Sequence, residues 1–72
     1  MTYTSIEIIN ARLVTLVSAE RRTTIDVHHV YSVEASTEQE ERGECQVCCG
    51  PAVFDAAMPR TEVLRALFRV RA

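Results

Sequence analysis

Glu44-Cys45-Gln46-Val47-Cys48-Cys49-Gly50-Pro51 places all three cysteines of the chain close together and follows them with a glycine. A Cys-x-x-Cys turn directs two thiolates at a common point, as in one half of a tetrahedral zinc site. Gly50 tolerates the positive φ that lets backbone N–H groups turn toward the sulfurs. The spacing therefore predicts a turn at Cys45 and Cys48 that offers half of a metal site.

The other half of such a site has to come from elsewhere in the chain. A complete structural zinc site needs four ligands, and there is no second Cys-x-x-Cys. His28 and His29 are adjacent on a predicted strand and point to opposite faces, so at most one of them can join the cysteines. We take Cys45, Cys48, Cys49 and His29 as candidate zinc ligands. The alternative is a tight turn with buried free thiols.

Length and composition predict one small globular domain. A chain of 72 residues buries only about 60% of its unfolded surface on folding. Its composition, with 47% hydrophobic and 25% charged residues, is ordinary for a globular protein. The net charge of −2 is of the wrong sign for non-specific binding of nucleic acid. With no long apolar run and no secretion signal, we expect no membrane partner and a cytoplasmic location, where thiols stay reduced. A small core with apolar edge strands makes a homodimer a further expectation.

The N-terminal third carries a helix signal. Thr4-Ser5-Ile6-Glu7 fits a capping box, and apolar side chains then recur at helical spacing as far as Val17. This pattern predicts a helix over about residues 5–20, with a strand as the competing interpretation because Ile, Val and Thr are plentiful. From Thr23 to Glu34 apolar and polar residues alternate, which predicts a half-buried strand.

The remaining segments are read from charge and periodicity. The polar connection ahead of the cysteines carries Glu38, Glu40 and Glu41, and we predict a solvated loop there. The tail over residues 62–71 satisfies the period of a strand and also that of a helix that follows Pro59. Periodicity alone leaves both structures open for the tail.

From Val33-Glu34-Ala35-Ser36 through the cysteine run to Ala52-Val53-Phe54, the chain resembles the CPXCG-motif cysteine-rich proteins. These are short bacterial chains of unassigned biochemical role that are regarded as zinc-binding. Their pattern is a Cys-Pro-x-Cys-Gly turn, a strand, a polar loop, a turn of the form Asp-Cys-x-Val-Cys-Cys-x-Pro and a closing hairpin. The resemblance covers about residues 33–72. The first cysteine pair is missing, since Arg22-Thr23-Thr24-Ile25 stands in its place.

The resemblance implies that Cys45 and Cys48 are ligands and that the tail is a strand. Combined with the patterns above, it predicts an α+β fold in a single domain over residues 1–72. In this fold, a helical extension over residues 1–22 packs on a small antiparallel β-sheet. The β-rich region over residues 23–72 contains a zinc-ribbon-like Cys-x-x-Cys hairpin.

We predict a binding protein rather than an enzyme. The chain has no nucleophile-elbow or oxyanion-loop signature and little room for a substrate pocket, and a Cys–His pair or redox exchange is the weaker alternative. The predicted function is a small protein–protein binding module that docks through the acidic loop or the arginines of the tail. The alternative is an inhibitor, encoded by a phage or mobile element, that docks on a host protein complex. The candidate partner-binding residues are Glu38, Glu40, Glu41, Arg65 and Arg69.

Overall fold

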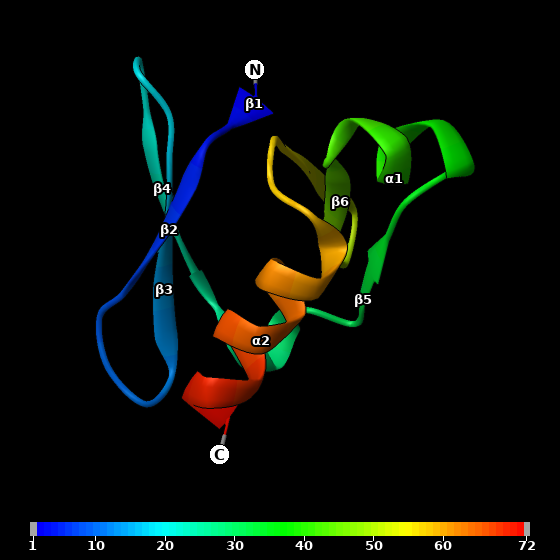
Figure 1. The fold of residues 1–72 in the computed structure, drawn as a ribbon. Coiled ribbons are helices and arrows are strands. Elements are labelled where there is room, and N and C mark those ends of the chain that lie inside the picture. The colour runs from blue at the N-terminus through cyan, green and yellow to red at the C-terminus, as the bar shows by residue number, and fades with distance from the viewer. Residues whose placement is uncertain (1, 72) are drawn as a thin grey trace.

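The structure is a computed structural model that describes residues 2–71, with side chains as far as residue 69. It is a small α+β domain with two β-sheets and a C-terminal helix (Figure 1). No helix among these residues is long and apolar enough to cross a membrane. In chain order the elements are β1 (Thr2–Tyr3), β2 (Ser5–Ile8), β3 (Leu13–Val17), β4 (Arg22–Asp26), the 3-10 helix η1 (Val27–His29), β5 (Ser32–Glu34), α1 (Thr37–Arg42), β6 (Cys45–Cys49), β7 (Ala52–Ala56) and α2 (Arg60–Arg71).

The first sheet is an antiparallel meander in the order β2-β3-β4. The expected helix over residues 5–20 is therefore wrong, and the competing strand is found. The side-chain oxygen of Asn10 accepts hydrogen bonds from the N–H groups of Arg12 and Leu13 at 2.8 and 2.9 Å. These bonds close a turn between two strands, and this turn interrupts the segment that was predicted to be a helix. The core-facing side chains then alternate along β3, where Val14 and Leu16 are fully buried.

The second sheet has the order β1-β7-β6-β5, in which β1 is parallel to β7 and the other pairs are antiparallel. β6 and β7 form a hairpin that is closed by Gly50 and Pro51. Gly50 has a φ of 62° and no other residue of this turn has a positive φ, which is the sign pattern of a type II′ turn. This hairpin is not the predicted zinc-ribbon-like Cys-x-x-Cys hairpin, because its turn follows the cysteines instead of containing them.

The predicted strand from Thr23 to Glu34 is interrupted. β4 ends at Asp26, whose carboxylate accepts the main-chain N–H of His28 at 2.9 Å and thereby begins η1. The chain leaves the first sheet through η1 and enters the second sheet at β5. The alternating pattern thus belongs to two strands in different sheets, not to one.

Both helices replace other expected structures. α1 lies where a solvated loop was predicted, and Ser36 and Gln39 form a capping box at its start. The tail forms α2, so the strand implied for it is wrong. The helix begins after Pro59, whose carbonyl accepts the N–H of Val63 at 3.2 Å.

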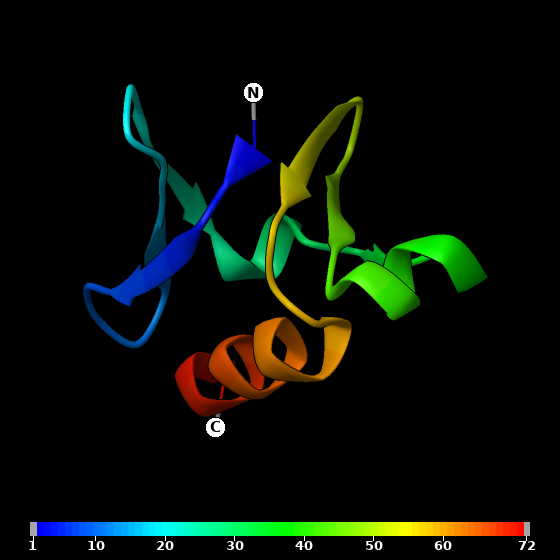
Figure 2. The same cartoon turned by 45° about the horizontal axis from the view of Figure 1, so that its top comes forward.

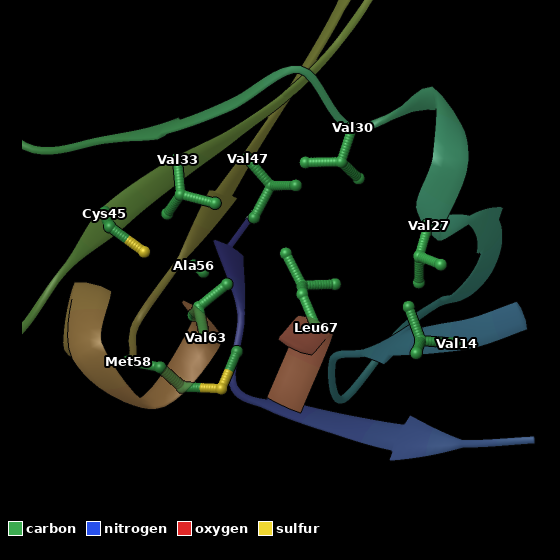
Figure 3. Close-up of a cluster of buried hydrophobic side chains, with 10 residues drawn as sticks. All are labelled: Val14, Val27, Val30, Val33, Cys45, Val47, Ala56, Met58, Val63 and Leu67. Carbon is green, nitrogen blue, oxygen red and sulfur yellow. The ribbon is translucent and has the colours of Figure 1, made fainter. Parts of the chain in front are cut away.

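α2 lies across the open side between the two sheets and contacts β2, β3, η1 and β5 (Figure 2). Its Val63 and Leu67 enter the core, in which side chains from both sheets meet (Figure 3). Tyr3 also joins the sheets, because its hydroxyl lies 2.6 Å from Thr23 Oγ1 and its ring packs edge-on against Phe54. The buried cluster consists of Val14, Val27, Val30, Val33, Cys45, Val47, Ala56, Met58, Val63 and Leu67.

Candidate binding surface

The cysteines lie in strand β6 and not in a turn. Successive side chains of a strand point to opposite faces, so Cys45 and Cys48, three residues apart, project from opposite sides of the sheet. Cys45 is 1% exposed and belongs to the core cluster, where its sulfur lies among apolar side chains (Figure 3). The predicted Cys-x-x-Cys turn is therefore wrong, because its two sulfurs cannot meet at one ion.

Cys48 takes part in a small polar group on the other face of the sheet. Its thiol donates a hydrogen bond of 3.4 Å to Oε2 of Glu34, which also accepts the Ser32 hydroxyl at 3.2 Å. Cys49 points to the same side of β6 as Cys45 and is half-buried. The three thiols are thus divided between the two faces of the sheet.

His29, the fourth candidate zinc ligand, lies in η1 and is exposed. Its neighbour His28 is also exposed. Over the part of the chain that the structure describes, there is no group of three or more His, Cys, Asp or Glu side chains that could hold a metal ion. The structure thus does not bring Cys45, Cys48, Cys49 and His29 together.

The surroundings of Cys45 and of Cys49 favour the protonated form of these two thiols. Burial raises the pKa of Cys45, against a smaller opposing effect of the positive charge of Arg60. Burial also raises the pKa of Cys49, and the neighbouring Cys48 raises it further. A thiol acts as a nucleophile in its thiolate form, and a raised pKa makes this form scarce at neutral pH. These two cysteines are therefore suited to packing and not to nucleophilic attack.

The acidic candidates lie on α1, at one end of the molecule (Figure 1). Glu38, Glu40 and Glu41 are exposed, and no residue of this helix is buried. Glu38 is 3.9 Å from Arg42, one helical turn further on, in an exposed pair of little energetic weight. α1 thus presents carboxylates to solvent, and one of them, that of Glu40, lines a hollow with Pro59, Arg60 and Thr61.

An open groove lies between β5 and α2, and we call it the α2–β5 groove. It has a volume of about 380 Å³. Tyr31 and Phe68 are exposed by 67% and 61%, and Leu64 lies beside them as a further apolar wall. The remaining lining comes from Val30, Ser32, Val33, Glu34, Arg60 and Leu67.

A second groove, the α2–β2 groove, runs along the other flank of the same helix. It has a volume of about 280 Å³, and Ile6 and Ile8 of β2 with Ala66 of α2 form its apolar part, while Glu62 of α2 adds one carboxylate to its lining. Arg65 and Arg69 line it from α2, so this groove contains both basic candidates of the sequence analysis. They are four residues apart on a helix and therefore lie side by side on successive turns.

Sequence reasoning identified the two arginines but missed Tyr31 and Phe68 as surface residues. A signal was present in the helical alternative for the tail. In a helix, Leu64 and Phe68 are one turn apart, at the border between a buried stripe and the charged residues. The exposure of Tyr31 had no comparable signal, because it depends on the break between β4 and β5.

Comparisons with known proteins give no relative. No protein-family model, no curated protein and no solved structure matches the chain. The resemblance of residues 33–72 to the CPXCG-motif proteins therefore stays a prediction.

Proposed function

We propose that the protein is a non-catalytic protein-binding module that docks through the outer surface of α2 and the two grooves beside it. The observation that carries this proposal is the pair of exposed aromatic rings, Tyr31 and Phe68, that lines the α2–β5 groove. Exposed apolar patches on a soluble domain mark interaction sites, and aromatic side chains at their centres supply much of the binding free energy. An apolar hollow between two such rings suits the side chain of a partner.

The non-catalytic part of the proposal rests on the placement of the reactive groups. Cys45 and Cys49 have raised pKa values, whereas His28 and His29 lie on η1, exposed to solvent. The usual activating base of a thiol is a histidine, and the Cys48 thiol donates its hydrogen bond to the carboxylate of Glu34, whereas both histidines lie on η1. We do not extend the proposal to a zinc site, since the sulfurs of β6 face opposite sides.

The inhibitor alternative is a special case of the same function. A module that binds a protein without transforming it acts by occupying a surface of its partner. An inhibitor of a host complex would therefore use the same grooves, and the experiment below bears equally on both.

Selection from a library of random peptides displayed on phage tests the proposal without a known partner. We expect enriched peptides whose affinity falls strongly with Phe68→Ala and with Tyr31→Ala. Val53→Ala is the matched control, because Val53 is 53% exposed on β7 and lies in neither groove. Thermal unfolding of each variant checks that the fold is kept. Failure to enrich any peptide, or loss of binding with Val53→Ala alone, would overturn the proposal.

A further inference from the structure

We infer that the partner presents an acidic amphipathic segment, whose carboxylates pair with Arg65 and Arg69 while its apolar side chains enter the grooves beside α2. This inference rests on the proposed function and names the chemistry of the partner.

Arg65 and Arg69 differ from Arg12, Arg22 and Arg42, three other exposed arginines. Arg12, Arg22 and Arg42 each pair with a carboxylate of this chain. Among the residues whose side chains the structure describes, Arg65 and Arg69 are exposed and form no ion pair. Over the described residues, two positive charges thus stand on successive turns of α2 without an ion pair, although Glu62 lines the same groove, and an external carboxylate can reach both.

Apolar surface lies directly beside these charges. Ile6 and Ile8 form the floor of the groove that Arg65 and Arg69 line, and Ile8 is 44% exposed. A guanidinium next to apolar surface is matched by a ligand that combines a carboxylate with an apolar side chain. Arg21, in the turn between β3 and β4, also lacks an ion pair over the described residues, but it lines neither groove.

The two grooves meet across the outer face of α2. Arg65 and Phe68 are three residues apart, so their side chains are neighbours on the helix surface. Phe68 belongs to the α2–β5 groove and Arg65 to the α2–β2 groove. One segment that lies along the helix can therefore place apolar side chains near Tyr31 and Phe68 and carboxylates on the arginines.

A nucleic acid fits this surface less well than an acidic protein segment. The chain has a net charge of −2, and the exposed carboxylates of α1 would repel a long polyanion. Phosphates gain nothing from the apolar floor at Ile6 and Ile8. A basic protein segment is disfavoured as well, because like charges that face each other across an interface lower affinity.

The peptides recovered by the phage selection provide the probes. We expect them to be rich in Asp and Glu, and we expect each peptide to bind roughly 5- to 30-fold more weakly when these residues are replaced by Asn and Gln. Arg65→Glu and Arg69→Glu should weaken binding of the acidic peptides by at least as much. Arg21→Glu, which makes the same charge change outside the grooves, should change their affinity by less than about 2-fold. Fluorescence anisotropy at several salt concentrations measures all of these affinities.

The outcomes separate this inference from the proposed function. The inference is overturned if the peptides depend on Phe68 but are neutral or basic. It is also overturned if their affinity does not change with Arg65→Glu and Arg69→Glu. In both cases the proposed function as a binding module is retained. An equal effect of Arg21→Glu overturns it too, since net charge alone would then explain the binding. A DNA oligonucleotide that binds more tightly than the acidic peptides has the same consequence. If no peptide is enriched, the proposed function fails and the inference fails with it.

Discussion

The Nε atom of Arg60 donates a hydrogen bond of 2.7 Å to the main-chain carbonyl of Val33. The first residue of α2 thereby satisfies an outward-facing backbone group of β5, which is the edge strand of the four-stranded sheet. Open strand edges invite pairing with other chains, and a covering side chain prevents it. Both residues also line the α2–β5 groove, so this bond fixes the distance between its two walls.

Arg60→Ala should lower the free energy of unfolding by about 1–3 kcal/mol, because it leaves a partly buried carbonyl without the charged donor. Urea denaturation followed by circular dichroism measures the change. Arg65→Ala is the control: Arg65 makes no side-chain hydrogen bond with the described residues, so the loss should stay within about 0.5 kcal/mol. Equal losses in the two variants would show that the bond to Val33 contributes nothing.

Leu16→Ala should cost about 2–5 kcal/mol, since Leu16 is fully buried in β3 and its truncation leaves a cavity. Leu13 lies on the opposite face of the same strand and is only partly buried. Leu13→Ala should therefore cost clearly less in the same denaturation experiment. Equal costs would speak for the helix over residues 5–20, on whose apolar stripe both leucines would lie.

The division of the cysteines between two faces predicts a stability that is insensitive to metal. A chelator should leave the melting temperature unchanged. Cys45→Ser should still destabilise by about 1–3 kcal/mol, because it buries a hydroxyl among apolar side chains, and half-buried Cys49 should tolerate the same change better. A melting temperature that falls with chelator, together with similar losses for Cys45→Ser and Cys48→Ser, would instead indicate a zinc site.

Asp26 makes the stability depend on acid pH. Its pKa lies below the ordinary value of 3.8, chiefly because its carboxylate accepts the main-chain N–H of His28, and also because it pairs with Arg12 at 2.7 Å. The charged form therefore stabilises the fold above the unfolded pKa, and this contribution is lost as the pH falls through the lower, folded pKa. Asp26→Asn keeps an acceptor for the N–H but removes the charge.

The difference in unfolding free energy between the native chain and Asp26→Asn should accordingly be largest near neutral pH. It should shrink as the pH falls below about 4, where the carboxylate of the unfolded chain is protonated. Denaturation at a series of pH values gives this difference directly. A difference that grows toward acid pH would contradict the lowered pKa.

The sequence predicted the α+β class, but it misassigned the N-terminal third and placed the turn of the hairpin at Cys45 and Cys48 instead of at Gly50 and Pro51. A strand period of two accounts for the positions of Ile6 and Ile8, and also for those of Val14 and Leu16. A helical period accounts equally well for the neighbouring apolar residues. The capping-box pattern at Thr4 to Glu7 favoured the helix. What decides between the two is the turn at Asn10 and the pairing of β2 with β3, which is a contact between segments and not a local preference.

The tail and the cysteines show a different limit. Val63, Leu64, Leu67 and Phe68 fit the helix that the structure contains, but the resemblance to a zinc-ribbon-like family favoured a strand. The same resemblance favoured a turn over the segment from Cys45 to Cys48. The segment is instead a strand, and strand alternation places the two sulfurs on opposite faces of the sheet. Arg65 and Arg69 could be selected from their charge alone, whereas their apolar neighbours Ile6 and Ile8 depend on the tertiary fold.

Docking of a partner on the outer surface of α2 is tested most directly by two-dimensional amide NMR. An isotopically labelled sample would be titrated with an acidic peptide recovered by phage selection. We expect the largest shift changes at Tyr31, Leu64, Arg65, Phe68 and Arg69, with little change in α1. Shift changes concentrated at Glu38, Glu40 and Glu41 of α1, with α2 unaffected, would contradict docking on α2 and move the binding surface to the acidic helix.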